Sequence, residues 1–345
     1  PQNPKDVKDI VKLVKSKTNI TLGFHGHDNL QMGLINTLTA LEEGCEIVDA
    51  TITGMGRGAG NLRTELLLTY LDSQNKIKFN FNKLGTVVAA FEDLRHIYGW
   101  GTNLPYMFSG AHSLPQKDVM EWVGMNRYSL NSILNALNNR KLIIKDNVRF
   151  PVLKKTQSFK SAFILGGGKS VRTHSEAIWK YADSRDDFCL IHAGIKNTKN
   201  FSKLNCKQFY SLVGVESDIL LNQIDFSNEL PFVCVFPPYP RKMGISISPK
   251  IQQISKELES IEFTSSSTDS PFVVALQTAI NLGVNEIFLI GFDGYNTGLN
   301  NNQFVLAQEN QNIINDILKN TNVCIKSLSP TKYENIQITS IYSLI

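Results

Sequence analysis

The sequence lacks any apolar run near the roughly 20 residues that a membrane-spanning helix needs, and it shows no secretory signal peptide. Its five cysteines form no CxxC pair, and an odd number of such thiols favours reduced cysteines in a cytoplasmic protein. The formal net charge is only +4 over 345 residues. A charge this small and dispersed argues against nucleic acid, so we expect neither a nucleic-acid nor a membrane partner.

What is present is the composition of a folded protein. Hydrophobic residues make up 42% and charged residues 19% of the chain, which excludes a chain that is disordered throughout. The length suggests two domains. The chain begins with Pro1 rather than methionine and runs at once into an amphipathic helix, so we expect a fragment or a processed chain. The oligomeric state stays open, with a homo-oligomer among the options.

The first 70 residues alternate between helical and strand-like segments, which predicts parallel βα units. Residues 100–115 are expected to be irregular and 119–138 to form a helix. Apolar spacing and β-branched runs predict helices over 4–17, 29–43, 62–70 and 84–98, and strands over 20–24 and 45–52.

The second half has the pattern of an open parallel α/β sheet. A basic segment with Pro151 separates it from the first half, which puts a domain boundary near residue 155. Helices are expected over 175–181 and 271–282. Buried strands are expected over 162–165, 189–192, 209–213, 232–236 and 286–290.

Two histidines, His25 and His27, stand two residues apart directly after the first expected strand. Alternation in an extended segment puts both on one side, so their imidazoles can face one divalent ion. The carboxyl end of a parallel strand is also where α/β folds place their chemistry. Taken alone, the motif favours a pair of ordinary surface or strand-end histidines over a metal site.

The surroundings of these histidines resemble a known family. Residues 22–33 are LGFHGHDNLQMG, and residues 54–65 are GMGRGAGNLRTE. Over residues 5–110 this pair resembles the pyruvate-carboxyltransferase-like aldolases and lyases, which include HMG-CoA lyase and 4-hydroxy-2-oxovalerate aldolase. The resemblance implies a TIM barrel, of which this chain would carry about three of the eight strands.

The resemblance also implies a metal site. His25 and His27 match two ligands of a catalytic divalent metal, which could be Mn²⁺, Mg²⁺ or Zn²⁺. Asn61 matches an oxygen ligand, although a turn residue after glycine is the alternative. Asp28 and Asn29 match the acid and amide positions after the histidines, whose side chains orient the metal ligands without binding the metal.

The activity that this resemblance implies is cleavage or formation of a C–C bond in a 2-oxo acid through a metal-stabilised pyruvate enolate. Tyr106 is the nearest match to a tyrosine assigned to proton transfer in the aldolase branch, with a packing tyrosine as the alternative. The family's Arg-Asp pair would lie upstream of Pro1. We therefore expect activity to need an N-terminal barrel half that this chain does not hold.

A glycine-rich turn, Gly166 to Ser170, follows the first strand of the second half, and such turns can bind anions. It is not a P-loop, because Phe163 stands where glycine is needed, and Val171 breaks the dinucleotide pattern. An anion or nucleotide site and a simple tight turn both remain open.

Residues 160–335 resemble Rossmann-like glycosyltransferase-related proteins such as bacterial sialyltransferases. That resemblance implies a sugar nucleotide near Gly166, Gly168, Ser170 and Asp293, with a turn carboxylate as the alternative for Asp293. The alternative function is then a nucleotide-sugar-dependent glycosyltransferase-like protein with a degenerate aldolase remnant, in polysaccharide biosynthesis. A non-catalytic binding module is a third option.

The predicted fold class is α/β: the C-terminal part of a TIM (β/α)8 barrel followed by a Rossmann-like parallel α/β domain. The expected domains are a partial TIM-barrel aldolase domain over 1–80, a helical post-barrel segment and linker over 81–155, and a Rossmann-like domain over 156–345.

Overall fold

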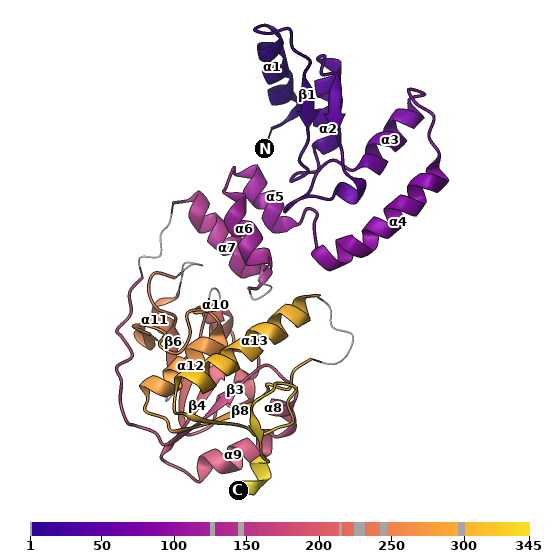
Figure 1. Ribbon diagram of the computed structural model, residues 1–345. Coiled ribbons are helices and arrows are strands. Elements are labelled where there is room, and N and C mark those ends of the chain that lie inside the picture. Colours follow the sequence, from indigo (N-terminus) through magenta and orange to yellow (C-terminus); the bar gives the residue numbers. More distant parts are fainter. Residues whose placement is uncertain are drawn as a thin grey trace. The chain divides into compact units, whose positions relative to one another are not determined.

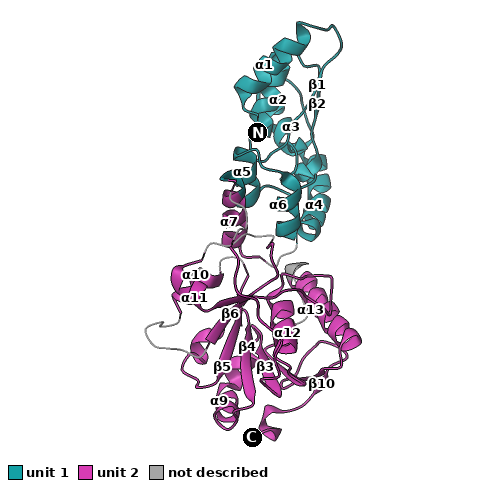
Figure 2. Cartoon of the chain, turned by 90° about the vertical axis from the view of Figure 1, so that its left-hand side faces the viewer, with its two compact units in different colours: residues 1–124, 140–142 teal, residues 125–139, 143–345 magenta. Residues whose placement is uncertain are grey.

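The computed structural model divides the chain into two compact units, which are described separately (Figure 2). Unit 1 comprises residues 1–124 and 140–142, and unit 2 comprises residues 125–139 and 143–345. Within the described part of the chain, no helix has the length and apolar character required to cross a bilayer. The residues that the structure describes are 2–124, 128–143, 148–213, 216–223, 232–241, 247–295 and 301–345.

Unit 1 packs helices around a two-stranded parallel sheet. Its first helix begins in a capping box, in which Asn3 and Asp6 satisfy each other's backbone amides. Val7 and Val11 on that helix pack against Ala40 and Cys45. The elements are α1 (Pro4–Lys15), β1 (Gly23–His25), α2 (Gly33–Glu42), β2 (Ile47–Asp49), η1 (Ile52–Gly54), α3 (Thr64–Ser73), α4 (Phe81–Tyr98), α5 (Leu104–Ala111) and α6 (Gln116–Gly124).

Two expectations for residues 100–138 are wrong. Residues 100–115 are not irregular throughout, because the Asn103 side chain accepts a hydrogen bond from the Tyr106 amide (3.1 Å) and starts α5. Residues 119–138 are not one helix, because α6 ends at Gly124 and α7 (Leu130–Lys141) begins after Ser129. The Ser129 hydroxyl accepts from the Ser132 amide (3.2 Å), which caps the new helix.

Unit 2 contains an all-parallel sheet of eight strands in the order β10-β9-β8-β3-β4-β5-β6-β7, so the predicted parallel α/β arrangement is confirmed. The strands are β3 (Ser161–Leu165), β4 (Phe188–Ala193), β5 (Lys207–Ser211), β6 (Phe232–Phe236), β7 (Ser255–Glu257), β8 (Glu286–Ile290), β9 (Cys324–Ser327) and β10 (Gln337–Ile338). The helices are α8 (Ser170–Thr173), α9 (Ser175–Asp183), η2 (Thr198–Asn200), α10 (Glu216–Leu221), α11 (Pro249–Gln253), α12 (Pro271–Asn281), α13 (Asn301–Asn320) and η3 (Ile341–Ser343).

The sheet has an apolar core on each face, because successive strand residues point in opposite directions. Ala162 and Ile164 of β3 belong to a cluster with residues of α12 and α13. Phe163 and Leu165 belong to a second cluster, with residues of α9. Helices therefore cover both faces of the sheet (Figure 1).

The order of the strands reverses between β3 and β8. From β3 the chain adds β4 to β7 on one side, and β8 to β10 lie on the other. At such a switch point the loops after the two strands diverge and leave a crevice at their carboxyl ends, where open α/β sheets bind ligands. Gly166–Ser170 follows β3 and Gly291–Asp293 follows β8.

No closed barrel is present among the described residues of unit 1, where only β1 and β2 pair with each other. The predicted barrel, the expected three strands of it and the domain limits at residues 80 and 155 therefore stay predictions. Four of the five cysteines are buried and free, and Cys324 is exposed.

A buried histidine makes the stability of unit 2 depend on pH. His192 is 1% exposed, stacks on Tyr210 and contacts Gln208 through Nε2 (2.9 Å). Burial lowers the pKa of His192 from 6.5 to about 4. The unfolded chain therefore binds a proton at His192 below about pH 6.5, whereas the folded chain binds it only below about pH 4. The stabilising contribution of the neutral His192 is thus fully present above pH 6.5 and decreases as the pH falls below that value.

We expect the free energy of unfolding to drop by about 3 kcal/mol from this group between pH 7 and pH 4. Urea unfolding of the wild type and of His192→Phe at both pH values measures the difference. The variant can keep the stack on Tyr210, and the Tyr210 hydroxyl still donates to Gln208 (3.1 Å). The same acid-induced loss in both proteins would contradict the assignment.

Candidate functional site

The two histidines lie at the carboxyl end of β1, as their order in the chain predicts. Both side chains are exposed, and their ring centroids are 4.9 Å apart at an interplanar angle of 85°. His25 is the register partner of Asp49 on β2, and its Nδ1 lies 3.5 Å from Asp49 Oδ2. The structure therefore brings two imidazoles and one carboxylate to the same end of the small sheet.

Asn61 lies directly opposite His27 in an isolated antiparallel bridge. The Asp28 amide donates to Gly60 O (3.1 Å) and the Leu62 amide to Gly26 O (2.9 Å). In this pattern His27 and Asn61 exchange no backbone hydrogen bonds with each other. The side chains of such a pair lie closer together than those of a hydrogen-bonded pair. Asn61 Nδ2 donates to Met55 O (3.1 Å), which leaves its Oδ1 as the atom available to a ligand.

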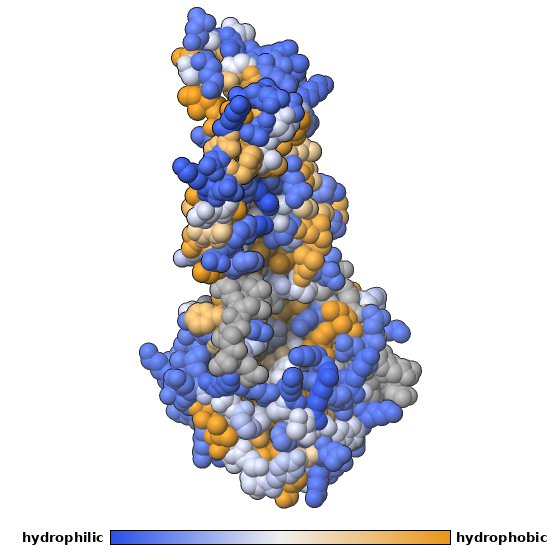
Figure 3. Space-filling view, turned by 90° about the vertical axis from the view of Figure 1, so that its right-hand side faces the viewer, coloured by the Kyte–Doolittle hydropathy of each residue, from blue (hydrophilic) through white to orange (hydrophobic). Residues whose placement is uncertain are grey.

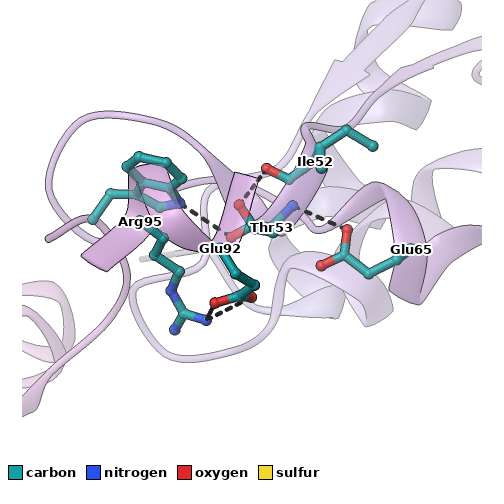
Figure 4. A network of polar contacts seen from close by, with 6 residues as sticks. Ile52, Thr53, Glu65, Glu92 and Arg95 are labelled. Carbon is teal, nitrogen blue, oxygen red and sulfur yellow. Dashed lines mark hydrogen bonds and ion pairs between the residues drawn. The ribbon is translucent and has the colours of Figure 1, made fainter. Parts of the chain in front are cut away.

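The glycine-rich loop that carries Asn61 is fixed at its start by Thr53, whose φ is +51°. The Thr53 amide donates to Glu65 Oε2 (3.0 Å), and the Trp100 indole donates to Thr53 O (3.2 Å). Figure 4 shows the Glu65 contact together with the neighbouring Glu92–Arg95 ion pair. Glu65 therefore holds the start of the loop that carries Asn61.

Asp28 and Asn29 form hydrogen bonds with groups other than the histidines. Asp28 Oδ1 accepts the amide of Gly33 (3.0 Å), the first residue of α2. Amides in the first turn of a helix have no partner within the helix, and Asp28 supplies one here. Asn29 Nδ2 donates to Gln116 Oε1 (3.2 Å), and Asn29 O accepts from the Thr102 hydroxyl (2.8 Å). Both residues thus hold the backbone around the motif. That they also orient the imidazoles of His25 and His27 stays a prediction.

Tyr106 lies in the first turn of α5 and is 5% exposed. Burial raises the pKa of its hydroxyl, so the group stays protonated at neutral pH. An ideal Cβ on Gly58 would lie 3.4 Å from Tyr106 Cε1. The ring therefore packs under the glycine-rich loop, and its part in proton transfer stays a prediction.

The donor set fits a divalent ion in part. Two imidazoles that share one ion at bonds of about 2.1 Å and an angle of about 90–110° have ring centroids about 4.5–5.2 Å apart, and the observed separation is 4.9 Å. The Asn61 amide oxygen adds a neutral donor. Among the described residues, however, no group of three or more His, Cys, Asp or Glu side chains is arranged to hold a metal.

The second predicted site lies at the switch point of the eight-stranded sheet. The Ser170 amide donates to Asp293 Oδ2 (3.0 Å), and the Ser170 hydroxyl donates to Asp293 Oδ1. An ideal Cβ on Gly168 would lie 2.6 Å from Asp293 Oδ2, so only glycine allows this approach. Asp293 thus already accepts the hydrogen bond of an amide that a phosphate would need as a donor. The same contact connects the turn to the loop after β8.

A cavity of about 710 Å³ lies beside this turn. Four aromatic side chains line it, and so do two lysines, Lys169 and Lys196. Lys196 Nζ donates to Gly167 O (2.6 Å). Sequence reasoning missed the lysine at position 196, since it lies in an irregular loop with no motif around it. The aromatic residues are Phe272, Phe292, Tyr295 and Tyr333.

The N-terminal part of the chain is similar in sequence to aldolases and lyases. Residues 2–90 match the protein-family model described as HMGL-like. Over 69 residues the chain is 44% identical to a 4-hydroxy-2-oxovalerate aldolase of Bacillus thuringiensis, and these residues are 20% of each chain. Over 74 residues it is 38% identical to an oxaloacetate decarboxylase of Mycobacterium tuberculosis, which covers 21% of this chain and 22% of that one.

The chain thus spans about a fifth of the length of the curated relatives that it matches. Among solved structures, it is 56% identical to the N-terminal domain of a candidate aldolase from Bacteroides vulgatus, over 39% of this chain and 44% of that one, with a TM-score of 0.36. A MAf glycosyltransferase from Magnetospirillum magneticum is 15% identical over 99% of this chain and 62% of that one, with a TM-score of 0.43.

Proposed function

We propose that unit 1 provides part of the metal site of a divalent-metal-dependent aldolase or lyase that acts on a 2-oxo acid. The observation that carries the proposal is the meeting of His25, His27 and Asn61 at one end of β1, within the HMGL-like residues 2–90. The similarity favours a 4-hydroxy-2-oxo acid as the substrate class, cleaved with release of pyruvate.

In this proposal His25 and His27 supply ring nitrogens and Asn61 supplies its amide oxygen. These are donors that Mn²⁺, Mg²⁺ or Zn²⁺ can use to different degrees. A bound divalent ion supplies a Lewis acid that polarises the carbonyl of the substrate. Glu65, through Thr53, keeps the loop that carries Asn61 in place. Tyr106, held protonated by burial, is the proposed proton donor.

The proposal includes further barrel elements that complete the site. Within the described residues, β1 and β2 form a sheet with each other alone, so one edge of each strand has no partner strand. Parallel sheets normally have more strands and are covered on both faces. Large apolar side chains of unit 1 are exposed, among them Ile20 (65%), Ile47 (56%) and Leu66 (44%). Figure 3 shows hydrophobic residues among hydrophilic ones on one face of the molecule. We expect aldolase activity only when additional elements cover this sheet.

Binding of a 2-oxo acid analogue tests this function on the chain as it stands. Oxalate presents two adjacent oxygens, as a 2-oxo acid does, whereas acetate does not. We expect oxalate to tighten Mn²⁺ binding to the chain about 10-fold after correction for Mn²⁺–oxalate in solution, with no effect of acetate. Mn²⁺ electron paramagnetic resonance titrations measure the free ion. Equal Mn²⁺ affinity with and without oxalate would contradict the proposal.

The second candidate function is binding of a sugar nucleotide by unit 2, as in a glycosyltransferase-like protein. The cavity at the switch point favours it, because aromatic walls suit a base and lysines suit a phosphate. Gly166, Gly168, Ser170 and Asp293 then shape the turn beside the ligand.

Thermal melting with CMP and UDP tests this candidate. A ligand that binds only the folded state raises the melting temperature, and we expect Lys196→Ala to reduce that rise. Lys203→Ala, a variant of an exposed lysine outside the cavity, is the control. Melting temperatures that neither nucleotide changes would leave the cavity without this function.

A further inference from the structure

A carboxylate within ion-pair distance of His25 comes from the second strand of unit 1. Asp49 and His25 are register partners across β1 and β2. In a parallel pair, side chains at matched positions point to the same face and lie about one strand spacing apart. The Asp49 Oδ2 to His25 Nδ1 distance is 3.5 Å.

Other polar groups near the motif have different partners. Asp28, which follows the histidines in sequence, accepts the Gly33 amide through Oδ1. His27 faces Asn61. Among the described residues, no other carboxylate lies within ion-pair distance of either imidazole. Asp49 is therefore the group placed to act on His25.

We propose that Asp49 is a positioning residue that fixes the orientation and tautomer of His25, so that Nε2 is the nitrogen presented to a metal ion. The inference rests on the proposed metal centre. A carboxylate that accepts from Nδ1–H leaves the lone pair on Nε2, and such partners commonly set ligand basicity as well.

The present geometry is compatible with this role. The 3.5 Å contact is longer than a charge-assisted hydrogen bond of about 2.8 Å. Both side chains are substantially exposed, at 44% for His25 and 65% for Asp49, so a small rotation about either side chain closes the distance. The backbone register, which brings the two residues together, does not need to change.

The test compares Asp49→Ala with Glu46→Ala, which removes an equal charge from an exposed position in the same unit. Neither side chain is in the core, so both variants should fold. We expect Asp49→Ala to weaken Mn²⁺ and Zn²⁺ binding about 10-fold, while Glu46→Ala leaves it unchanged. Asp49→Glu should restore part of the affinity, because it returns a carboxylate near Nδ1.

A spectroscopic readout separates positioning from a general structural effect. Long-range ¹H–¹⁵N correlation spectra of the metal-free chain report which imidazole nitrogen carries the proton. We expect His25 to be protonated at Nδ1 in the wild type and to shift toward the other tautomer in Asp49→Ala, with His27 unchanged.

The outcomes distinguish this inference from the function on which it rests. Equal metal affinity and an unchanged His25 tautomer in Asp49→Ala would overturn the role of Asp49 and leave the metal centre in place. A wild-type chain that binds neither ion would overturn the metal centre, and the role of Asp49 with it.

Discussion

Replacing both His25 and His27 by alanine is expected to weaken divalent-metal binding by about 100-fold or more. The two imidazoles are the nitrogen donors of the proposed site, and the Asn61 amide oxygen alone is a weak, neutral ligand. Both side chains are exposed, so their removal leaves no cavity and should not unfold the chain. Isothermal titration with Zn²⁺ and Mn²⁺ measures the loss.

The control for this double variant is His96→Ala. His96 is an exposed histidine on α4 of the same unit, so the variant removes an imidazole without touching the pair. We expect it to bind metal as the wild type does. If the double variant retained wild-type affinity, or if His96→Ala lost it, the ions would be held elsewhere.

Replacing Gly166 by alanine is expected to destabilise unit 2 by about 3 kcal/mol. An ideal Cβ at this position would lie 2.5 Å from the carbonyl oxygen of Gly291 and 3.0 Å from its carbonyl carbon. These are backbone atoms of the loop after β8, and they cannot rotate away as a side chain can. The Gly166 amide also donates to Ile290 O (2.8 Å), so a shift of the turn would disturb this bond as well.

The neighbouring glycine provides a matched control. An ideal Cβ on Gly167 would meet only the flexible Lys196 side chain, at 3.4 Å. Gly167→Ala should therefore change the free energy of unfolding by less than about 0.5 kcal/mol. Urea unfolding of both variants measures the difference. Similar stabilities for the two would show that the loops after β3 and β8 do not approach as closely as described.

Much of the fold could be predicted from the sequence because its periodic segments are long. The central strands β3, β4 and β8 are continuous apolar runs and were expected within a residue or two. By contrast, β7 was not expected, since it holds the buried Glu257. This carboxylate pairs with Arg241 (2.5 Å) and Arg149 (3.0 Å) and accepts the Phe150 amide (3.1 Å), which makes its burial tolerable. Charged residues of this kind give no strand signal.

The candidate metal site shows a similar division. The HGH and GN motifs could be singled out because each is local in sequence, and the structure places His27 opposite Asn61. Asp49 was missed although it ends the strand that follows the first βα unit, where strand ends meet. Its contact with His25 depends on the register between two strands, which sequence spacing alone does not fix.

The most direct test of the metal centre is anomalous diffraction from crystals of the chain grown with Zn²⁺ or Mn²⁺. We expect one strong anomalous peak within ligand distance of ring nitrogens of both His25 and His27, with the Asn61 amide oxygen adjacent. A peak at other residues, or no peak beside these histidines at saturating metal, would contradict it.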